Sequence, residues 1–199
     1  MDDAIAELRN VSKAYGETPV LRGVSLALAP GAPVCVTGRS GIGKTTLFRL
    51  ILGLEKPDSG AVRVKKGARF AAVFQEDRLI ARLSAADNAR FVCPPAHMPD
   101  EAALAGASAA LGLTRAELER PVSELSGGQR RRAALLRALL APADAVLLDE
   151  PFTGLDAAAR RAAAAYIRAQ CARRALLCIT HEPDAAALLG ARVFALEDV

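Results

Sequence analysis

The sequence is poor in aromatic side chains. None of its 199 residues is tryptophan, and aromatic residues make up only 4% of the chain. Proteins that hold single-stranded nucleic acid stack its bases on aromatic side chains, so this composition disfavours such a surface. The net charge of +4 is mild and fits an acidic ligand, a membrane-adjacent surface or simple solubility.

Long apolar runs are also missing, although 52% of the residues are hydrophobic. A helix that spans a bilayer needs about 20 consecutive apolar residues. The richest stretch, residues 133–148, is broken by Arg137, Pro142 and Asp144. The first residues lack the basic start and apolar segment of a secretory signal, so we expect a cytosolic protein.

The four cysteines lack the spacing that is typical of metal ligands. Each lies in or beside apolar sequence, so we expect them to be buried as small hydrophobic residues. They are Cys35, Cys93, Cys171 and Cys178. A chain of this length without a visible internal repeat is expected to form one domain with a sizeable core.

A glycine-rich stretch is the first feature that points to chemistry. Residues 38–45 read Gly-Arg-Ser-Gly-Ile-Gly-Lys-Thr, which fits the phosphate-loop pattern G-x-x-x-x-G-K-S/T. They lie between a predicted buried strand at 33–37 and a predicted helix at 46–52. Lys44 can reach the β- and γ-phosphates of a nucleotide, and the Thr45 hydroxyl can bind Mg²⁺. The expected nucleotide-binding residues here are Gly38, Arg39, Ser40, Gly41, Ile42, Gly43, Lys44, Thr45 and Thr46.

A second candidate anion site lies at residues 125–129, Leu-Ser-Gly-Gly-Gln. Ser126 and Gln129 have the spacing of a capping box, which predicts that a helix begins here and continues to residue 140. The N–H groups of Gly127 and Gly128 beside the serine hydroxyl are typical of a helix N-terminus that binds an anion. An ordinary helix cap with a flexible approach is the alternative.

An apolar strand at residues 145–148 is followed by two carboxylates. If it emerges beside the phosphate loop, Asp149 can hold Mg²⁺ directly or through water. Glu150 can then orient or deprotonate an attacking water. The alternative is a strand end followed by solvated acids.

Periodicity along the chain predicts an α/β fold. Residues 5–11 and 20–28 alternate like antiparallel strands, and residues 83–140 are predicted to be helical. Strands and helices alternate again from 145 to 196, which indicates a mostly parallel sheet with helices on both faces. We therefore expect an ATPase core built on the phosphate loop, with an N-terminal antiparallel β subdomain and an inserted helical lobe.

In this order, the motifs resemble those of the ATP-binding subunit of an ABC transporter over nearly the whole chain. Residues 38–45 are similar to the Walker A loop, 125–129 to the ABC signature, and 146–150 to the Walker B strand with its catalytic glutamate. The resemblance implies that Gln75 lies near Mg²⁺ and the attacking water, and that His181 contacts the γ-phosphate. A polar strand-end glutamine and a surface histidine are the alternatives.

Two further residues join the candidate site through this resemblance. It implies that Tyr15 stacks on adenine and that Asp156, in Gly154-Leu155-Asp156, belongs to the D-loop. A tyrosine that only packs against its neighbours is the alternative for Tyr15. The residues expected to bind Mg²⁺, from the residue types and the resemblance together, are Thr45, Gln75 and Asp149.

The resemblance also implies cofactors and partners. ATP and Mg²⁺ would bind between two head-to-tail copies, with each phosphate loop facing Ser126 and Gly128 of the other copy. Residues 1–75 and 142–199 would form the ATP-binding core, and residues 76–141 a helical signature lobe that contacts an integral membrane permease. The chain would then lie in the cytoplasm on the inner face of the cell membrane. A solute-binding protein is a possible further partner, and no nucleic acid is expected.

Residues 73–77 resemble the corresponding stretch in the ATP-binding subunits of importers of nitrate, sulfonates and taurine, so we expect import of a small solute. Residues 78–83 lack the Pro and Trp that are usual there, which leaves the solute open. A soluble ABC-type ATPase acting on nucleic acid or the ribosome is the alternative, and the arginines at 130–132 with Arg137 could be offered for it. On an amphipathic helix we interpret these arginines as a solvated face. A non-hydrolysing module is disfavoured by the intact Lys44, Asp149, Glu150 and His181.

Overall fold

A parallel sheet of five strands forms the centre of the computed structural model, which describes residues 3–196. The strand order is β5-β6-β7-β3-β8. Because β6 and β7 are buried along their whole length, they are apolar on both faces, as is typical of parallel sheets. The strands are β3 (Val34–Thr37), β5 (Phe70–Val73), β6 (Ala145–Asp149), β7 (Ala175–Ile179) and β8 (Arg192–Ala195).

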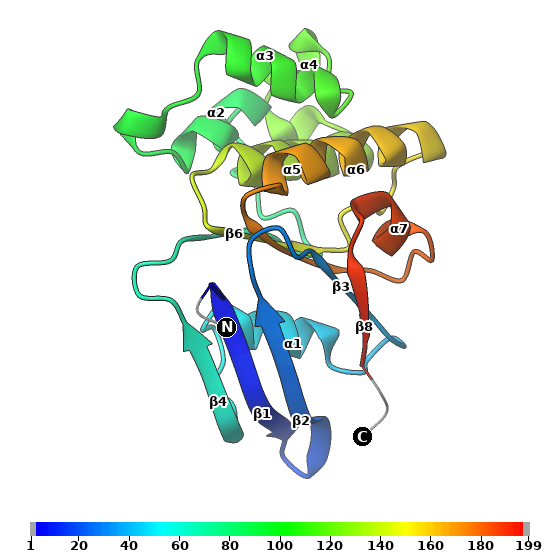
Figure 1. Cartoon of the computed structure of the whole chain (residues 1–199). Helices are drawn as coiled ribbons and strands as arrows, with labels where there is room; N and C mark the ends of the chain where they lie inside the picture. Colours follow the sequence, from blue (N-terminus) through cyan, green and yellow to red (C-terminus); the bar gives the residue numbers. More distant parts are fainter. Residues whose placement is uncertain (1–2, 197–199) are drawn as a thin grey trace.

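An antiparallel sheet of order β2-β1-β4 lies at one end of the molecule (Figure 1). It consists of β1 (Ala6–Tyr15), β2 (Thr18–Leu28) and β4 (Ser59–Val64). The two strands predicted at 5–11 and 20–28 are confirmed, and both continue further toward a tight turn at Gly16, whose φ is 61°. The continuation carries register shifts, which explains why strict alternation stops after residue 11.

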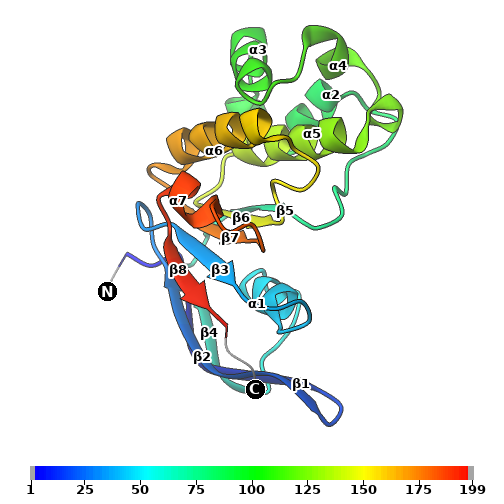
Figure 2. The same ribbon diagram turned by 90° about the vertical axis from the view of Figure 1, so that its right-hand side faces the viewer.

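Helix α1 (Lys44–Ile51) packs between the two sheets. Its Leu47 and Phe48 share one hydrophobic cluster with Val36 of β3 and with Leu8 and Leu28 of the antiparallel sheet. Figure 2 shows α1 at the end of β3, beside the antiparallel strands. The apolar face of this helix therefore fixes where the phosphate loop stands between the sheets.

The opposite face of the parallel sheet carries α5 (Gly127–Leu140), α6 (Ala157–Cys171) and α7 (Ala185–Leu189). Beyond them lie α2 (Ala85–Phe91), α3 (Glu101–Ala110) and α4 (Arg115–Glu119), at the end remote from the antiparallel sheet (Figure 1). One hydrophobic cluster runs without a break from Val73 and Val146 of the sheet to Leu104 and Leu111 of the outer helices. The helices predicted on both faces of the sheet are thus confirmed.

Side-chain caps mark where most of these helices begin. The residue before each helix accepts a hydrogen bond from a backbone N–H inside the first turn, which satisfies one of the N–H groups that a helix start leaves unpaired. The capping box predicted at Ser126 and Gln129 is present, and a second one joins Thr114 and Glu117. The capping residues are Ser84, Asp100, Thr114, Ser126 and Asp156.

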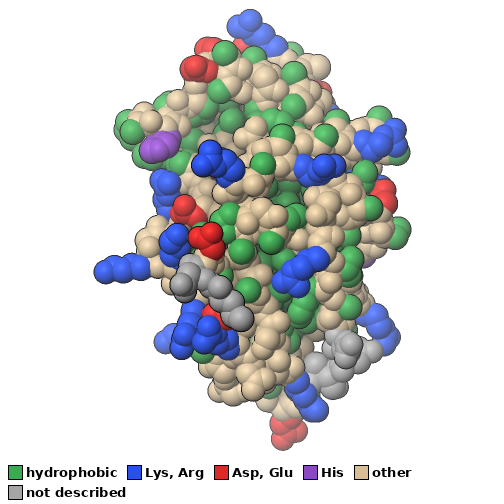
Figure 3. All heavy atoms as spheres, viewed as in Figure 1, with side chains coloured by type: hydrophobic (Ala, Val, Ile, Leu, Met, Phe, Trp, Pro, Cys, Tyr) green, Lys and Arg blue, Asp and Glu red, His purple; other side chains and the backbone are tan. Residues whose placement is uncertain are grey.

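All four cysteines are buried and unpaired, as predicted. Within residues 3–196, no helix is long and apolar enough to cross a membrane. On the face shown in Figure 3, lysines and arginines are spread from the outer helices to the antiparallel sheet. The excess positive charge is therefore not gathered into a single patch on that face.

Candidate nucleotide-binding site

A hollow of about 380 Å³ opens where β3, β5 and β6 end and α1 begins. Its lining brings together residues that are up to 164 positions apart in the sequence, from Tyr15 to Ile179, and most of them are ones that the sequence analysis selected. They are Tyr15, Ser40, Gly41, Gly43, Lys44, Thr45, Thr46, Gln75, Asp149 and Glu150, together with Val20 and Ile179.

Glycine is required at position 43 because the loop passes directly against β2. A Cβ on Gly43 would lie 2.8 Å from both Cγ1 and the carbonyl oxygen of Val20, and the φ of Gly43 is 105°. Only glycine adopts this conformation freely, and only glycine has room there. The glycine at position 43 of the motif is therefore required by the packing of the loop against β2 as well as by phosphate binding.

Lys44 is the first residue of α1, and its side chain folds back onto the phosphate loop. Its Nζ donates to the carbonyl oxygens of Gly38 at 2.7 Å and Arg39 at 2.8 Å. The first turn of α1 contains no acidic residue, so its unpaired N–H groups and the ammonium act together as an anion site. This arrangement fits the phosphates of a nucleotide.

Asp149 lies at the end of β6 and is only 3% exposed. Burial, and then the neighbouring charge of Glu150, raise the pKa of Asp149 from its ordinary 3.8 to about 6. The positive charges of Arg131 and Lys44 and a hydrogen bond from Thr45 act in the opposite direction. The carboxylate is therefore held as an ion at a cost that a bound cation would relieve.

The donors around Asp149 fit Mg²⁺. This ion prefers oxygen ligands and is usually held by one or two protein side chains together with substrate phosphates. The Thr45 hydroxyl and the Asp149 carboxylate are in contact beside the phosphate loop. The part of the chain that the structure describes contains no cluster of three or more metal-binding acids, histidines or cysteines.

Glu150 and His181 form a pair at the mouth of the hollow. The Nδ1 atom of His181 lies 2.9 Å from Oε1 of Glu150, and the side chains are 69% and 15% exposed, respectively. The hydrogen bond and the charge of Glu150 raise the pKa of His181. Glu150 follows β6 with a φ of 52°, and its N–H donates to Ile179 of β7 at 2.8 Å. The carboxylate can thus accept a proton while the imidazole holds its position.

Tyr15 lies on the other side of the hollow, at the end of β1. Its hydroxyl donates to Glu55 and lies 3.5 Å from Oγ1 of Thr46. The residue is 47% exposed, so its ring is fixed at one end while part of its surface stays accessible. An aromatic ring held in this way can stack on a base.

Gln75 follows β5 and also lines the hollow. Its carbonyl oxygen accepts a hydrogen bond of 2.7 Å from Arg131. Arg131 is only 5% exposed, so the interpretation of the arginines at 130–132 as a solvated face is wrong for this residue. The physical reason is that the loop after β5 crosses α5 at this point and presents its carbonyl groups to the helix.

The signature residues stand outside the hollow. Ser126 and Gln129 bond each other reciprocally, Ser126 N to Oε1 of Gln129 at 2.7 Å and Gln129 N to Oγ of Ser126 at 3.3 Å. The remaining amide donor of Gln129 is used by Glu117 of α4. The N–H groups of Gly127 and Gly128 lie at the start of α5, and neither glycine lines the hollow around the phosphate loop.

Gly128 also packs against the D-loop. A Cβ on Gly128 would lie 3.0 Å from the carbonyl oxygen of Gly154. Two residues further on, Asp156 caps α6 by accepting from the N–H of Ala159 at 2.8 Å. The signature and the D-loop therefore form one composite surface through the contact between Gly128 and Gly154, and Asp156 is not among the residues that line the hollow.

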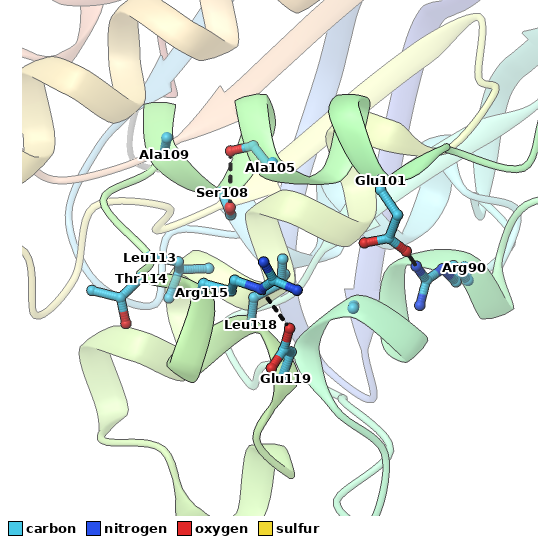
Figure 4. Close-up of a pocket in the computed structure, with 11 residues that line it drawn as sticks. Arg90, Glu101, Ala105, Ser108, Ala109, Leu113, Thr114, Arg115, Leu118 and Glu119 are labelled. Atoms are coloured by element: carbon cyan, nitrogen blue, oxygen red, sulfur yellow. Dashed lines mark hydrogen bonds and ion pairs between the residues drawn. The ribbon is translucent and has the colours of Figure 1, made fainter.

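A larger hollow of about 620 Å³ lies among α2, α3 and α4 (Figure 4). Two ion pairs border it, Arg90 with Glu101, and Arg115 with Glu119 at 2.9 Å. None of the nucleotide-binding residues predicted from the sequence lines it.

Sequence reasoning missed Glu55 and Arg131. Glu55 fixes the Tyr15 hydroxyl but follows α1 without any motif. Arg131 looks like its two arginine neighbours in the sequence. Its position on the signature helix, four residues or about one turn after Gly127, is the only signal that could have singled it out.

Comparison with known proteins gives a consistent result. A family model described as ABC transporter matches residues 21–153. The aliphatic sulfonates import ATP-binding protein SsuB of Granulibacter bethesdensis is 40% identical over 97% of this chain and 80% of its own length. SsuB 1 of Rhodococcus jostii is 39% identical over 96% of this chain and 79% of its own length. An ATP-binding cassette solved as a dimer in a post-hydrolysis state, bound to ADP and Pi, superposes with a TM-score of 0.84 at 27% identity. That superposition covers 97% of this chain and 94% of the other.

Proposed function

Since this chain belongs to the ABC transporter family, we propose that it is the ATP-hydrolysing subunit of an importer that moves a small solute through separate membrane subunits. The observation that carries this proposal is the hollow that joins the phosphate loop to Asp149 and Glu150. The soluble nucleic-acid ATPase has no comparable support, because the curated relatives described above are import proteins.

Binding of ATP follows from the positive end of α1. The N–H groups of residues 38–45 and the ammonium of Lys44 receive the phosphates, and the partly exposed ring of Tyr15 receives the adenine. Lys44 exchanges its bonds to the neutral carbonyl oxygens of Gly38 and Arg39 for bonds to phosphate oxygens, in which both the donor and the acceptor are charged. Mg²⁺, held by Thr45 and Asp149 with Gln75 beside it, would neutralise charge that develops on the transferred phosphoryl group.

Hydrolysis follows from the pair at the mouth of the hollow. Glu150 accepts the proton of a water aimed at the γ-phosphate, while His181 holds the carboxylate in place and, in our proposal, contacts the γ-phosphate. A positioned general base contributes about 10²–10⁴-fold to a rate. The Glu150–His181 distance of 2.9 Å supports this division of roles.

The separation of the two anion sites supports a head-to-tail dimer. Ser126, Gly127 and Gly128 do not line the hollow that contains the phosphate loop of their own chain, so in our proposal a second cassette supplies them. Asp156 belongs to the same surface through the contact between Gly128 and Gly154. A solved cassette that superposes on this chain is itself a dimer.

We place the subunit in the cytoplasm on the inner face of the cell membrane, with integral permease subunits as partners and a solute-binding protein as a further one. In this arrangement residues 1–75 and 142–199 form the ATP-binding core. Residues 76–141 form the lobe that contacts the permease, and Gln75 lies at the junction between the two. The names of the curated relatives make an aliphatic sulfonate the first solute to test.

Glu150→Gln tests the ATPase and the dimer together. The variant keeps the shape of the side chain but removes the proton acceptor, so hydrolysis should fall by about 10²–10⁴-fold while ATP binding remains. Bound ATP then favours the closed state by mass action. The variant should sediment as a dimer with Mg-ATP, and as a monomer with ADP or without nucleotide.

Glu7→Gln is the matched control, because Glu7 pairs with Arg9 on the antiparallel sheet at 2.8 Å, away from the hollow. Turnover by Glu150→Gln equal to wild type would contradict the assignment of the base. Monomers under all three conditions would contradict pairing with a second copy and leave a different cassette as the partner.

A further inference from the structure

The loop that carries Gln75 has little secondary structure of its own. Between the end of β5 at Val73 and the start of α2, residues 74–83 belong to no helix or strand. Backbone carbonyl groups in such a segment need partners where they are shielded from water. For four of these residues the partners are arginine side chains of α5.

Two arginines share this task. Arg131 donates through Nη1 to the carbonyl oxygen of Phe74 and through Nη2 to that of Gln75, both at 2.7 Å. Arg137, further along α5, donates to the carbonyl oxygens of Asp77 at 3.1 Å and Arg78 at 2.7 Å. The planar guanidinium of Arg131 therefore spans two consecutive peptide groups, which fixes their orientation as well as their distance.

Arg131 makes these bonds while it is nearly inaccessible to water. Its neutralising partner is Asp77 on the same loop, whose Oδ1 lies 3.3 Å from Nη1. Burying a charge is costly unless the ion is both paired and hydrogen bonded. An apolar side chain could fill the same space at a lower cost, but it could not hold the loop.

The loop is also held from the side of the phosphate loop. The ring of Phe74 meets Phe48 of α1 edge-on, with 5.4 Å between the ring centroids. The guanidinium of Arg78 lies 3.8 Å from the centroid of Phe74, and the φ of Arg78 is 46°. The backbone beside Gln75 is thus fixed between α1, which begins at Lys44, and α5, which Ser126 caps.

We propose that Arg131 is a positioning residue for ATP hydrolysis: it fixes the backbone of Gln75 to the signature helix, so that the Gln75 amide stands at a set place beside Asp149 and Glu150. Arg131 acts through Gln75 and does not touch the nucleotide. The inference rests on the proposed ATPase and assigns to this chain a residue that its motifs do not include. Displacement of a reacting group by about 1 Å can lower a rate by about 10²-fold, so the loss of this clamp should be measurable.

A double-mutant cycle tests the proposal in the full chain. Arg131→Lys keeps the charge but cannot span two carbonyl groups. It should lower kcat at least tenfold while the KM for ATP stays within threefold of wild type. In the Gln75→Ala background the same change should cost less than twofold, because there is no amide left to position.

Arg174→Gln is the matched control. Arg174 makes the same type of bond to α5, donating to the carbonyl oxygen of Leu139 at 3.0 Å, but it lies at the other end of the helix. It should leave kcat unchanged. Hydrogen exchange supplies a second readout, since the N–H groups of residues 74–79 should exchange at least tenfold faster in Arg131→Lys and not in Arg174→Gln.

The proposal would be overturned if the loss of kcat in the double variant equalled the product of the losses in the two single variants. A kcat of Arg131→Lys within twofold of wild type would overturn it as well. If Arg131→Lys does not fold, as shown by urea unfolding, Arg131→Gln replaces it under the same criteria. A wild-type chain without ATPase activity would instead overturn the proposed function, so the two failures can be told apart.

Discussion

Replacing Asp149 with asparagine should stabilise the nucleotide-free chain at neutral pH. The wild-type carboxylate is buried at the end of β6 beside Glu150, and its pKa is about 6. The amide of Asp149→Asn has the same shape and carries no charge. The Thr45 hydroxyl, which donates to the carboxylate, can turn to accept from the amide.

The size of the effect follows from linkage. A rise of the pKa from 3.8 to about 6 corresponds to about 3 kcal/mol at 1.36 kcal/mol per unit. One imperfectly bonded amide costs about 1 kcal/mol, which leaves a gain of about 2 kcal/mol. For a chain of this length that raises Tm by about 4–8 °C.

The sign of the pH dependence can be checked in the same way. Because the pKa is higher in the folded than in the unfolded chain, the folded chain binds more protons between pH 3.8 and about 6. The destabilisation by Asp149 is therefore complete above about pH 6 and is relieved as the pH falls toward 3.8. The advantage of Asp149→Asn should be full at pH 7.5 and nearly absent at pH 4.

Urea unfolding at pH 7.5 and at pH 4 measures this difference. Asp58→Asn is the control of opposite sign, because Lys13 and the N–H of Ala14 lower the pKa of Asp58, so its replacement should destabilise at neutral pH. Mg-ATP should raise the midpoint of wild type and not that of Asp149→Asn. A lower midpoint for Asp149→Asn at pH 7.5, or an equal gain at both pH values, would refute the reasoning.

Three further changes test the anion sites. Lys44→Ala should weaken ATP binding about 10–100-fold, the value of a charge-assisted bond, and equal affinities by calorimetry would contradict the phosphate-loop assignment. Ser126→Arg should leave the ATP affinity of a single chain within twofold and abolish steady hydrolysis; unchanged turnover would show that Ser126 does not complete a partner's site. Gly128→Ala should lower turnover at unchanged ATP affinity, because its Cβ meets the carbonyl oxygen of Gly154 at 3.0 Å. Gly106→Ala is the control and should leave turnover unchanged, because its Cβ meets nothing within 4 Å. Equal turnover in the two variants would argue against the composite surface.

Much of the fold could be predicted because its cues are local. The caps at Thr114 and Ser126 lie within three residues of the N–H groups that they satisfy, so spacing alone identifies them. The buried strands β6 and β7 are short apolar runs that need no knowledge of distant residues. By contrast, the outer half of β1 is held by pairing with β2 across register shifts, which alternation does not reveal.

The candidate site divides in the same way. The phosphate loop and the two acids after β6 are contiguous, so their chemistry can be predicted from the sequence. The burial of Arg131 among three consecutive arginines depends on where the loop after β5 crosses α5, which is a tertiary fact. Gln129 was predicted both as a cap and as a nucleotide-binding residue, but its side-chain amide accepts from the N–H of Ser126 and donates to Glu117, so it is engaged within its own chain.

The left-handed backbone at Glu150 has a consequence for anyone who tries to make this protein more heat-resistant. A residue with a Cβ in this conformation is strained by about 1–2 kcal/mol, whereas glycine is not and asparagine tolerates it better. Laboratory evolution under thermal selection would therefore favour Glu150→Gly or Glu150→Asn, and both remove the carboxylate that is paired with His181. Thermal selection and selection for turnover favour opposite residues at this position, so a robust and active variant has to gain its stability at other positions.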